Sequence, residues 1–205
     1  MISVVIKDSD RIITTKINKT LASMFNQTLS TQANTIKSEL RVLIRGTLMS
    51  SREIFSLSGG VLKLDFGLTS DPSAQIVNSI VNSLDINITK VTGSSTGIRG
   101  GITITLQPTD YSNLLSLPIA RQTIEGGSLP WLEWLLTLGD AIIIADFGVQ
   151  YEAGTGRTGG AHMTRKKRPF KVNTAFSGTA ENNFISRAIN SIEPQIMQTI
   201  IKAFK

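Results

Sequence analysis

Apolar side chains recur at intervals of three and four residues through much of the N-terminal quarter of the chain. The series starts with Ile13, Ile17 and Leu21 and resumes at Ile36 after a polar stretch. This spacing aligns the side chains in one stripe along an α-helix. The polar stretch, residues 28–35, is only weakly helical, so the pattern allows one long helix or two consecutive helices. A helix of such length usually packs across a sheet or along a partner.

Two short apolar runs flank this helical region. Before it, residues 2–6 read Ile-Ser-Val-Val-Ile and can form a short strand or an ordered tail. After it, Gly59 and Gly60 break the chain. We expect the following residues, 61–68, to form a short element that lies on the core.

A second helix has a clear start signal at Asp71 and Pro72. The aspartate side chain can cap the helix, and proline at the first helical position loses no hydrogen bond. The apolar positions that follow keep helical spacing. They predict a buried face made of Ile76, Val77, Ile80, Val81 and Leu84.

Two runs of alternating apolar and polar residues come next, at 86–91 and 102–106. A turn rich in glycine and serine, residues 92–100, joins them. Alternation of period two with such a turn predicts an antiparallel hairpin.

The second half of the chain predicts a further, longer hairpin. Residues 141–151 are rich in β-branched and aromatic side chains and predict a strand, with residues 165–172 as its antiparallel partner. Between them, residues 152–163 predict a long mobile loop, because glycine loses more backbone entropy on ordering than any other residue. Together these residues predict an arm that projects at about 141–173.

The remaining segments are a short helix, an irregular stretch and a final helix. Trp131 and Trp134 share a helix face, and such a pair belongs to a core more often than to an interface. Residues 108–127 are predicted to be mostly irregular. The last helix is predicted to start near Thr179, and Pro194 should bend or restart it.

These elements predict an α+β fold in a single domain, residues 1–205. We expect a small antiparallel sheet with a long projecting hairpin, packed against a long N-terminal helix, a middle helix and a C-terminal helix. The chain has no cysteine, so disulfides and cysteine-ligated metals are excluded. No apolar run approaches the roughly 20 residues that span a bilayer, and the N-terminus is too short for a signal-peptide core. We therefore expect a protein used inside a cell.

The glycine spacing at residues 154–159 matches that of a dinucleotide-binding loop. That motif requires a helix directly after the loop, so that the phosphate meets the helix N-terminus. A basic run follows here instead, which favours a hairpin loop. His162 is the only histidine and has no partners at the spacing of a metal site or triad. The sequence therefore predicts no catalytic residues, no metal site and no cofactor.

The net charge of +6 favours contact with acidic surfaces. The densest cluster of positive charge is the run of four cations at residues 165–168. Such a run can contact phosphate or an acidic protein, or it can be a solvated strand that resists aggregation. We expect the following residues to make contacts with other subunits or with DNA in a channel: Arg157, Arg165, Lys166, Lys167 and Arg168.

Five stretches of the sequence resemble the neck and tail-completion proteins of tailed bacteriophages, which lie at the head–tail junction. They are RIITTKINKTLASMFNQTL, SREIFSLSGGVLKLDFGL, GGSLPWLEWLL, GTGRTGGAHM and RPFKVNTAFSGTAENNFISRAI. The resemblance implies an α+β subunit of a ring, commonly of six copies, without catalytic residues. Its implied partners are further copies, the tail tube or sheath protein and the connector proteins, with DNA passing through the lumen and no membrane. It implies a place in the virion neck or tail, after assembly in the host cytoplasm.

Two other functions remain open at this point. A basic nucleic-acid-binding accessory protein would account for the net charge and the cationic run. An enzyme that binds a nucleotide at residues 154–159 is the more distant alternative.

Overall fold

The computed structural model describes residues 7–124, 127–165 and 169–204 of the chain. It confirms the α+β class. The helices are α1 (Asp10–Met49), α2 (Arg52–Gly59), α3 (Val61–Asp65), α4 (Ser73–Asn82), α5 (Ser112–Leu115), α6 (Trp131–Leu136), α7 (Phe184–Ser191) and α8 (Glu193–Lys202), with a 3₁₀ turn at Pro118–Ala120. The strands are β1 (Asp85–Ser94), β2 (Gly97–Thr105), β3 (Gln122–Ile124), β4 (Gly127–Leu129), β5 (Ile142–Ile144), β6 (Phe147–Tyr151), β7 (Ala161–Arg165) and β8 (Phe170–Lys171).

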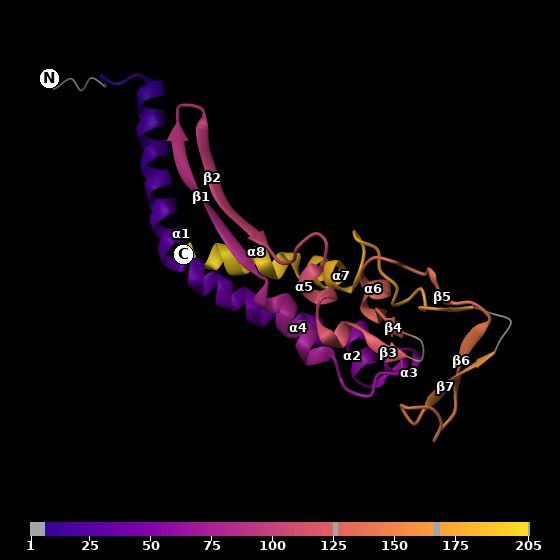
Figure 1. Ribbon diagram of the computed structural model, residues 1–205. Coiled ribbons are helices and arrows are strands. Elements are labelled where there is room, and N and C mark those ends of the chain that lie inside the picture. The colour runs from indigo at the N-terminus through magenta and orange to yellow at the C-terminus, as the bar shows by residue number, and fades with distance from the viewer. Residues whose placement is uncertain (1–6, 125–126, 166–168, 205) are drawn as a thin grey trace.

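The molecule is elongated (Figure 1). Most of the short elements gather around the C-terminal half of α1, and we call this part the body. The N-terminal half of α1 extends from the body together with the β1–β2 hairpin. The described strands pair antiparallel as β1–β2, β3–β4, β5–β8 and β6–β7, so the one small sheet expected from sequence is four separate pairs. No helix in the described ranges is long and apolar enough to cross a membrane.

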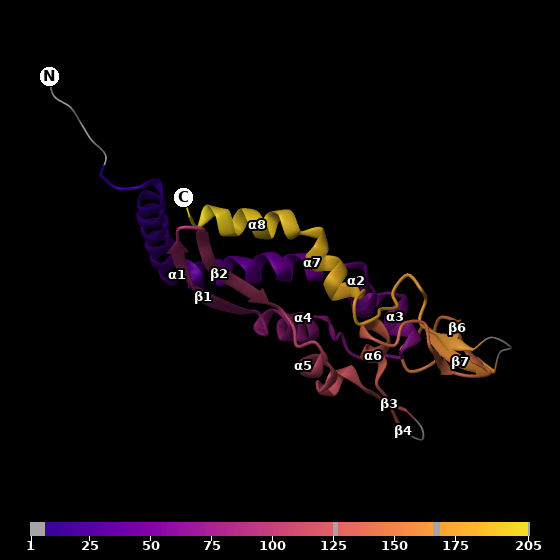
Figure 2. The same cartoon turned by 90° about the horizontal axis from the view of Figure 1, so that it is seen from above.

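Of the two alternatives for the N-terminal region, the structure has the single helix. α1 runs for 40 residues through the polar stretch. There the hydroxyls of Ser30 and Thr31 donate to the carbonyl of Gln27, at 2.8 and 3.1 Å. Hydroxyls that bond back to the preceding turn are associated with helix bending. α1 is bent between its two halves, as both views show (Figures 1 and 2).

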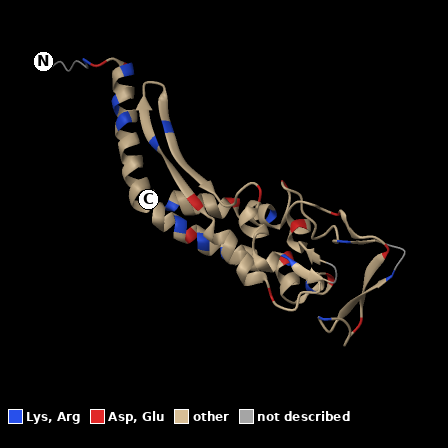
Figure 3. Cartoon of the chain, viewed as in Figure 1, with Lys and Arg blue, Asp and Glu red and all other residues tan. Residues whose placement is uncertain are grey.

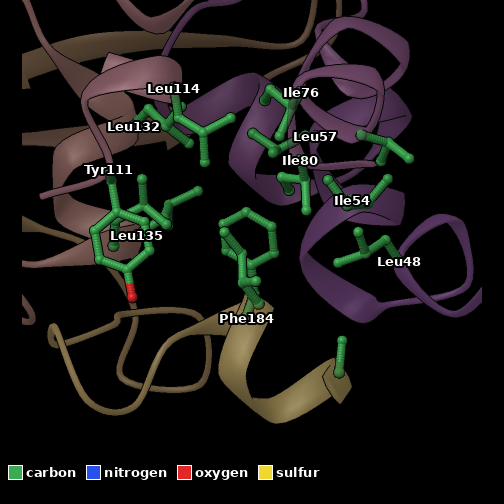
Figure 4. Packing of buried hydrophobic residues seen from close by; sticks show 14 of the residues in the cluster. Leu48, Ile54, Leu57, Ile76, Ile80, Tyr111, Leu114, Leu132, Leu135 and Phe184 are labelled. Carbon is green, nitrogen blue, oxygen red and sulfur yellow. The ribbon is translucent and has the colours of Figure 1, made fainter. Parts of the chain in front are cut away.

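The core lies in the body, where α1, α2, α4, α5, α6 and α7 meet (Figure 4). Trp131 is fully buried, as the tryptophan spacing predicts, and its indole N–H donates to the carbonyl of Ile119 at 2.9 Å. Its ring packs against Phe66, with the two centroids 5.4 Å apart. The residues labelled in the figure are Leu48, Ile54, Leu57, Ile76, Ile80, Tyr111, Leu114, Leu132, Leu135 and Phe184.

One buried amide, that of Asn183, joins three parts of the body. Its Oδ1 accepts from the backbone N–H groups of Ile185 and Ser186 and so caps α7. Its Nδ2 donates to the Tyr111 hydroxyl at 2.7 Å and to the carbonyl of Leu136 at 3.3 Å. This cap starts the final helix at Phe184 rather than near Thr179. The predicted break near Pro194 is confirmed, since α7 ends at Ser191 and α8 starts at Glu193.

We call residues 10–29 of α1 with the β1–β2 hairpin the stalk. Its own core is small and consists of Ala22, Leu29 and Val91. A bulge between Thr89 and Thr92 removes Val91 from the ladder. The Asn26 side chain replaces the missing strand partner: its Oδ1 accepts from the Val91 N–H and its Nδ2 donates to the Val91 carbonyl, both at 2.8 Å.

The predicted strand 141–151 is divided in two. Asp146 adopts a left-handed backbone with φ of 60°, which turns the chain between β5 and β6. β5 then pairs with β8, and β6 pairs with β7. The stretch 108–127, expected to be mostly irregular, holds α5, the 3₁₀ turn and β3.

Replacing Asn26 with alanine should loosen the hairpin from α1. The change leaves the N–H and carbonyl of Val91 without a partner in a part-buried position, at a cost of about 1–3 kcal/mol in the free energy of unfolding. Denaturant unfolding measures the cost, and hydrogen exchange in residues 85–105 locates it. Asn34→Ala, at an exposed site on the same helix, should change stability by less than about 0.5 kcal/mol. Equal losses in both variants would contradict this account.

Candidate assembly surfaces

A groove of about 540 Å³ lies between the β6–β7 hairpin and the body. α3 and the β3–β4 pair supply its wall on the body side, and β5, β8 and the hairpin supply the opposite wall. Apolar side chains dominate both walls. They are Leu64, Phe66, Ile124, Leu129, Ile144, Phe147, Val149, Ala161, Met163 and Phe170.

The hairpin has one apolar face, which is directed toward this groove. In its register Phe147 lies opposite Arg165, and Val149 lies opposite Met163. Residues directly opposite one another in an antiparallel pair share a face. Gln150, on the other face, is exposed. The groove therefore lies under the apolar side of the hairpin.

Tyr151 and Asp65 tie the hairpin to α3. The tyrosine hydroxyl donates to Oδ1 of Asp65 at 2.5 Å. Burial raises the pKa of the Asp65 carboxyl above its ordinary value, and the hydrogen bond from Tyr151 offsets part of the rise. Burial, together with the neighbouring Asp65, also raises the pKa of Tyr151.

The loop between β6 and β7 is more compact than a free arm. The N–H of Glu152 donates to the carbonyl of Gly160 at 3.0 Å, and that of Gly154 donates to Gly159 at 2.9 Å. These bonds extend the hairpin by a further pair and close the loop. β7 follows it directly, so the glycine spacing at 154–159 opens a strand rather than the helix that a dinucleotide site needs.

Arg157, expected at a projecting tip, is turned back onto the body. Its guanidinium donates to the carbonyl of Thr123 in β3 at 3.0 Å. The side chain also passes over Gly67, where a Cβ atom would lie 2.8 Å from Nε. Arg157 therefore lines the groove from the loop. The contact joins residues far apart in the sequence, and no local pattern indicates it.

Of the other predicted contact residues, the structure describes Arg165, which ends β7 and is exposed. Lys166, Lys167 and Arg168 lie outside the described residues. The ring Nδ1 of His162 is 2.9 Å from the Thr155 hydroxyl within the loop. In the described ranges, no three His, Asp or Glu side chains are grouped to hold a metal ion.

The stalk carries a second apolar surface, on the stripe that the sequence pattern identifies. Ile17, Leu21, Met24 and Phe25 continue the predicted stripe, yet Ile17 is 54% and Met24 60% exposed. The hairpin instead covers a neighbouring face of α1 that holds Asn18, Ala22, Asn26 and Leu29. These four have helical spacing too. Their amides and small side chains are the signal that could have identified the covered face.

The exposed stripe continues onto the C-terminal helix. The ring of Phe25 lies edge-on to that of Phe204, with centroids 5.5 Å apart. We define the stalk stripe by its exposed members: Ile17, Leu21, Met24, Phe25, Met197, Ile201 and Phe204. Contiguous exposed apolar surface of this kind marks sites of protein interaction.

The stalk is also basic (Figure 3). Residues 10–29 and 85–105 hold five lysines and arginines against two aspartates, a net charge of +3. Asp8 pairs with Lys16. Lys19, Lys90 and Arg99 are exposed.

Asp65→Asn should raise the free energy of unfolding at pH 7, because the amide avoids keeping a carboxylate in a half-buried place. The pKa of Asp65 in the folded state is raised above 3.8. Its contribution to the free energy of unfolding is therefore fully present below pH 3.8 and is lost as the pH rises through the folded pKa. The advantage of the variant should therefore grow from pH 4 to 7 in denaturant titrations.

Asp71→Asn is the control, for which the expected change in stability at pH 7 has the opposite sign. Burial raises the pKa of Asp71, but hydrogen bonds from Ser73 and Ser58, with the charge of Lys63, outweigh it and lower the pKa below 3.8. Its contribution is present above pH 3.8 and is lost as the pH falls through the folded pKa, so this variant should be destabilised at pH 7. A change in stability of the same sign in both variants would contradict the pKa directions given for Asp65 and Asp71.

Comparison of the chain with protein-family models, with curated proteins and with solved structures found no match. A function for the two apolar surfaces therefore rests on their geometry and on the resemblance seen in the sequence.

Proposed function

We propose that the protein is a structural subunit of the neck of a tailed bacteriophage. Several copies, six by the resemblance, form a ring that completes or terminates the tail tube and joins it to the head connector. DNA passes through the lumen without sequence-specific contacts. The tail tube or sheath protein and the connector proteins are the neighbours of the ring.

The observation that carries the proposal is the stalk stripe. Its seven large apolar side chains lie on α1, on α8 and, for Phe204, just after α8, and they remain outside both hydrophobic clusters. Full burial of such a side chain contributes about 1.5–3 kcal/mol relative to full exposure, and burial of the parts that are exposed here would contribute a share of that. A surface of this kind fits a subunit whose stable form is an assembly.

The positions of the five stretches that carry the resemblance support the same proposal. The stretch at residues 11–29 forms the helical part of the stalk. The other four contribute to the walls of the groove, through Leu64 and Phe66, Leu129, Met163, and Phe170. The five stretches thus contribute to both apolar surfaces, and three of them also supply core residues such as Leu57, Trp131 and Phe184.

The first test is the mass of the purified protein, with negative-stain images of the same sample. The expected result is a closed ring with a hole wide enough for a duplex. The double variant Ile17→Glu, Met24→Glu should stay folded yet lose the ring, because burying two unpaired carboxylates costs several kcal/mol each.

Val42→Glu is the matched control. Val42 is 73% exposed on the same helix but lies outside the stalk stripe, so this variant should assemble as the wild type does. A strictly monomeric wild type that does not join partner proteins, or a ring that tolerates the double variant, would overturn the proposal.

A second function, that of a basic nucleic-acid-binding accessory protein, is favoured by the net charge of the stalk. It predicts tight, sequence-independent binding of duplex DNA with strong salt dependence. Each lost phosphate contact lowers the slope of log affinity against log salt by about 0.9. Lys19→Gln with Arg99→Gln should then lower the slope by roughly 2, whereas Arg121→Gln with Lys202→Gln should not. Equal slopes in the two double variants would reject this function.

A further inference from the structure

We propose that the groove under the β6–β7 hairpin binds residues 2–6 of a second copy of this chain, added as a strand along the outer edge of β7. The inference rests on the proposed ring, for which it specifies one contact between neighbouring copies. It assigns an occupant to a surface that the described residues leave open.

The edge of β7 can accept a strand. Among the described strands, β7 pairs only with β6. The bond from the Glu152 N–H to the Gly160 carbonyl makes that pair hydrogen-bonded, and bonded pairs alternate along an antiparallel ladder. The backbone N–H and carbonyl groups of Met163 and Arg165 therefore point away from β6. β8 lies near β6. The outer edge of the hairpin is therefore the side of β7 that faces away from β6.

The groove offers apolar walls beside this edge. Alternate side chains of an added strand would lie on the same face as Met163, between the hairpin and the body-side residues Leu64 and Ile124. Recognition by strand addition combines main-chain hydrogen bonds with pockets for alternate side chains. The occupant that fits is a short segment with apolar residues at every second position.

Residues 2–6 have this pattern. In a strand, Ile2, Val4 and Ile6 share one face, and four of the five residues are β-branched. The other residues outside the described ranges lack this pattern: 125–126 is only two residues long, 166–168 are all basic, and 205 is a single lysine.

Geometry excludes the groove of the same copy. α1 starts at the tip of the stalk, at the opposite end of the molecule from β6 and β7 (Figure 1). α1 alone is about 60 Å long at 1.5 Å per residue. Six residues reach at most about 20 Å when fully extended. The segment can therefore fill this groove only in a neighbouring copy.

The resulting contact is heterologous, because the stalk tip of one copy meets the groove of the next. Each copy then both donates a segment and accepts one. Contacts of this type generate a ring when the rotation between copies closes, and an open filament when it does not. The stalk stripe is a separate surface and can be tested separately.

The absence of native cysteine allows a direct test in the full-length protein. Val4→Cys with Met163→Cys should form disulfides between copies on oxidation, seen as a ladder of covalent multimers on non-reducing gels. Val4→Cys with Gln150→Cys is the control, because Gln150 lies on the other face of the hairpin. Deleting residues 2–6 should abolish the ring while leaving a folded protein.

The outcomes separate this inference from the proposed function. Rings that form without the Met163 cross-link, or after the deletion, would overturn the groove contact and leave the ring standing. Cross-linked multimers that never close would support the contact and overturn the ring. A cross-link within one copy, or equal cross-linking in the control pair, would overturn the inference.

Discussion

The structure depends on the length of α1. Its 40 residues extend for about 60 Å, whereas a compact chain of this length has a radius of gyration of about 17 Å. One half of the helix must therefore leave the body. The β1–β2 hairpin covers one face of that half, and the stripe that includes Ile17 and Met24 stays exposed.

Two side-chain amides, one part-buried and one fully buried, hold this geometry together. In the stalk, Asn26 supplies the two hydrogen bonds that the bulge removes from Val91. In the body, Asn183 joins the start of α7 to Tyr111 and to the end of α6. A buried polar group without partners costs more than its hydrogen bonds contribute. These contacts therefore select one arrangement among several that apolar packing alone would allow.

Local signals predicted much of the fold. Period-two alternation identified the β1–β2 hairpin, and Asp71 with Pro72 marked the start of α4. The features that local signals did not reveal depend on contacts between residues distant in sequence. The covered face of α1 is chosen by the hairpin, and the position of Arg157 depends on Thr123 and Gly67. For the candidate site, composition indicated a protein that contacts others, but the apolar groove and the stalk stripe required the three-dimensional structure.

The placement of the two apolar surfaces constrains how copies can meet. A two-fold interface brings the same patch of both subunits together, and the stalk stripe alone could form one. The groove lies at the opposite end of the molecule, beside a strand edge without a described partner. A two-fold pair through the stripe would leave both grooves open. A head-to-tail arrangement can use both surfaces of every copy, and the same contact then recurs around a closed assembly. The distance that α1 imposes between its two ends thus favours a ring over an isolated dimer.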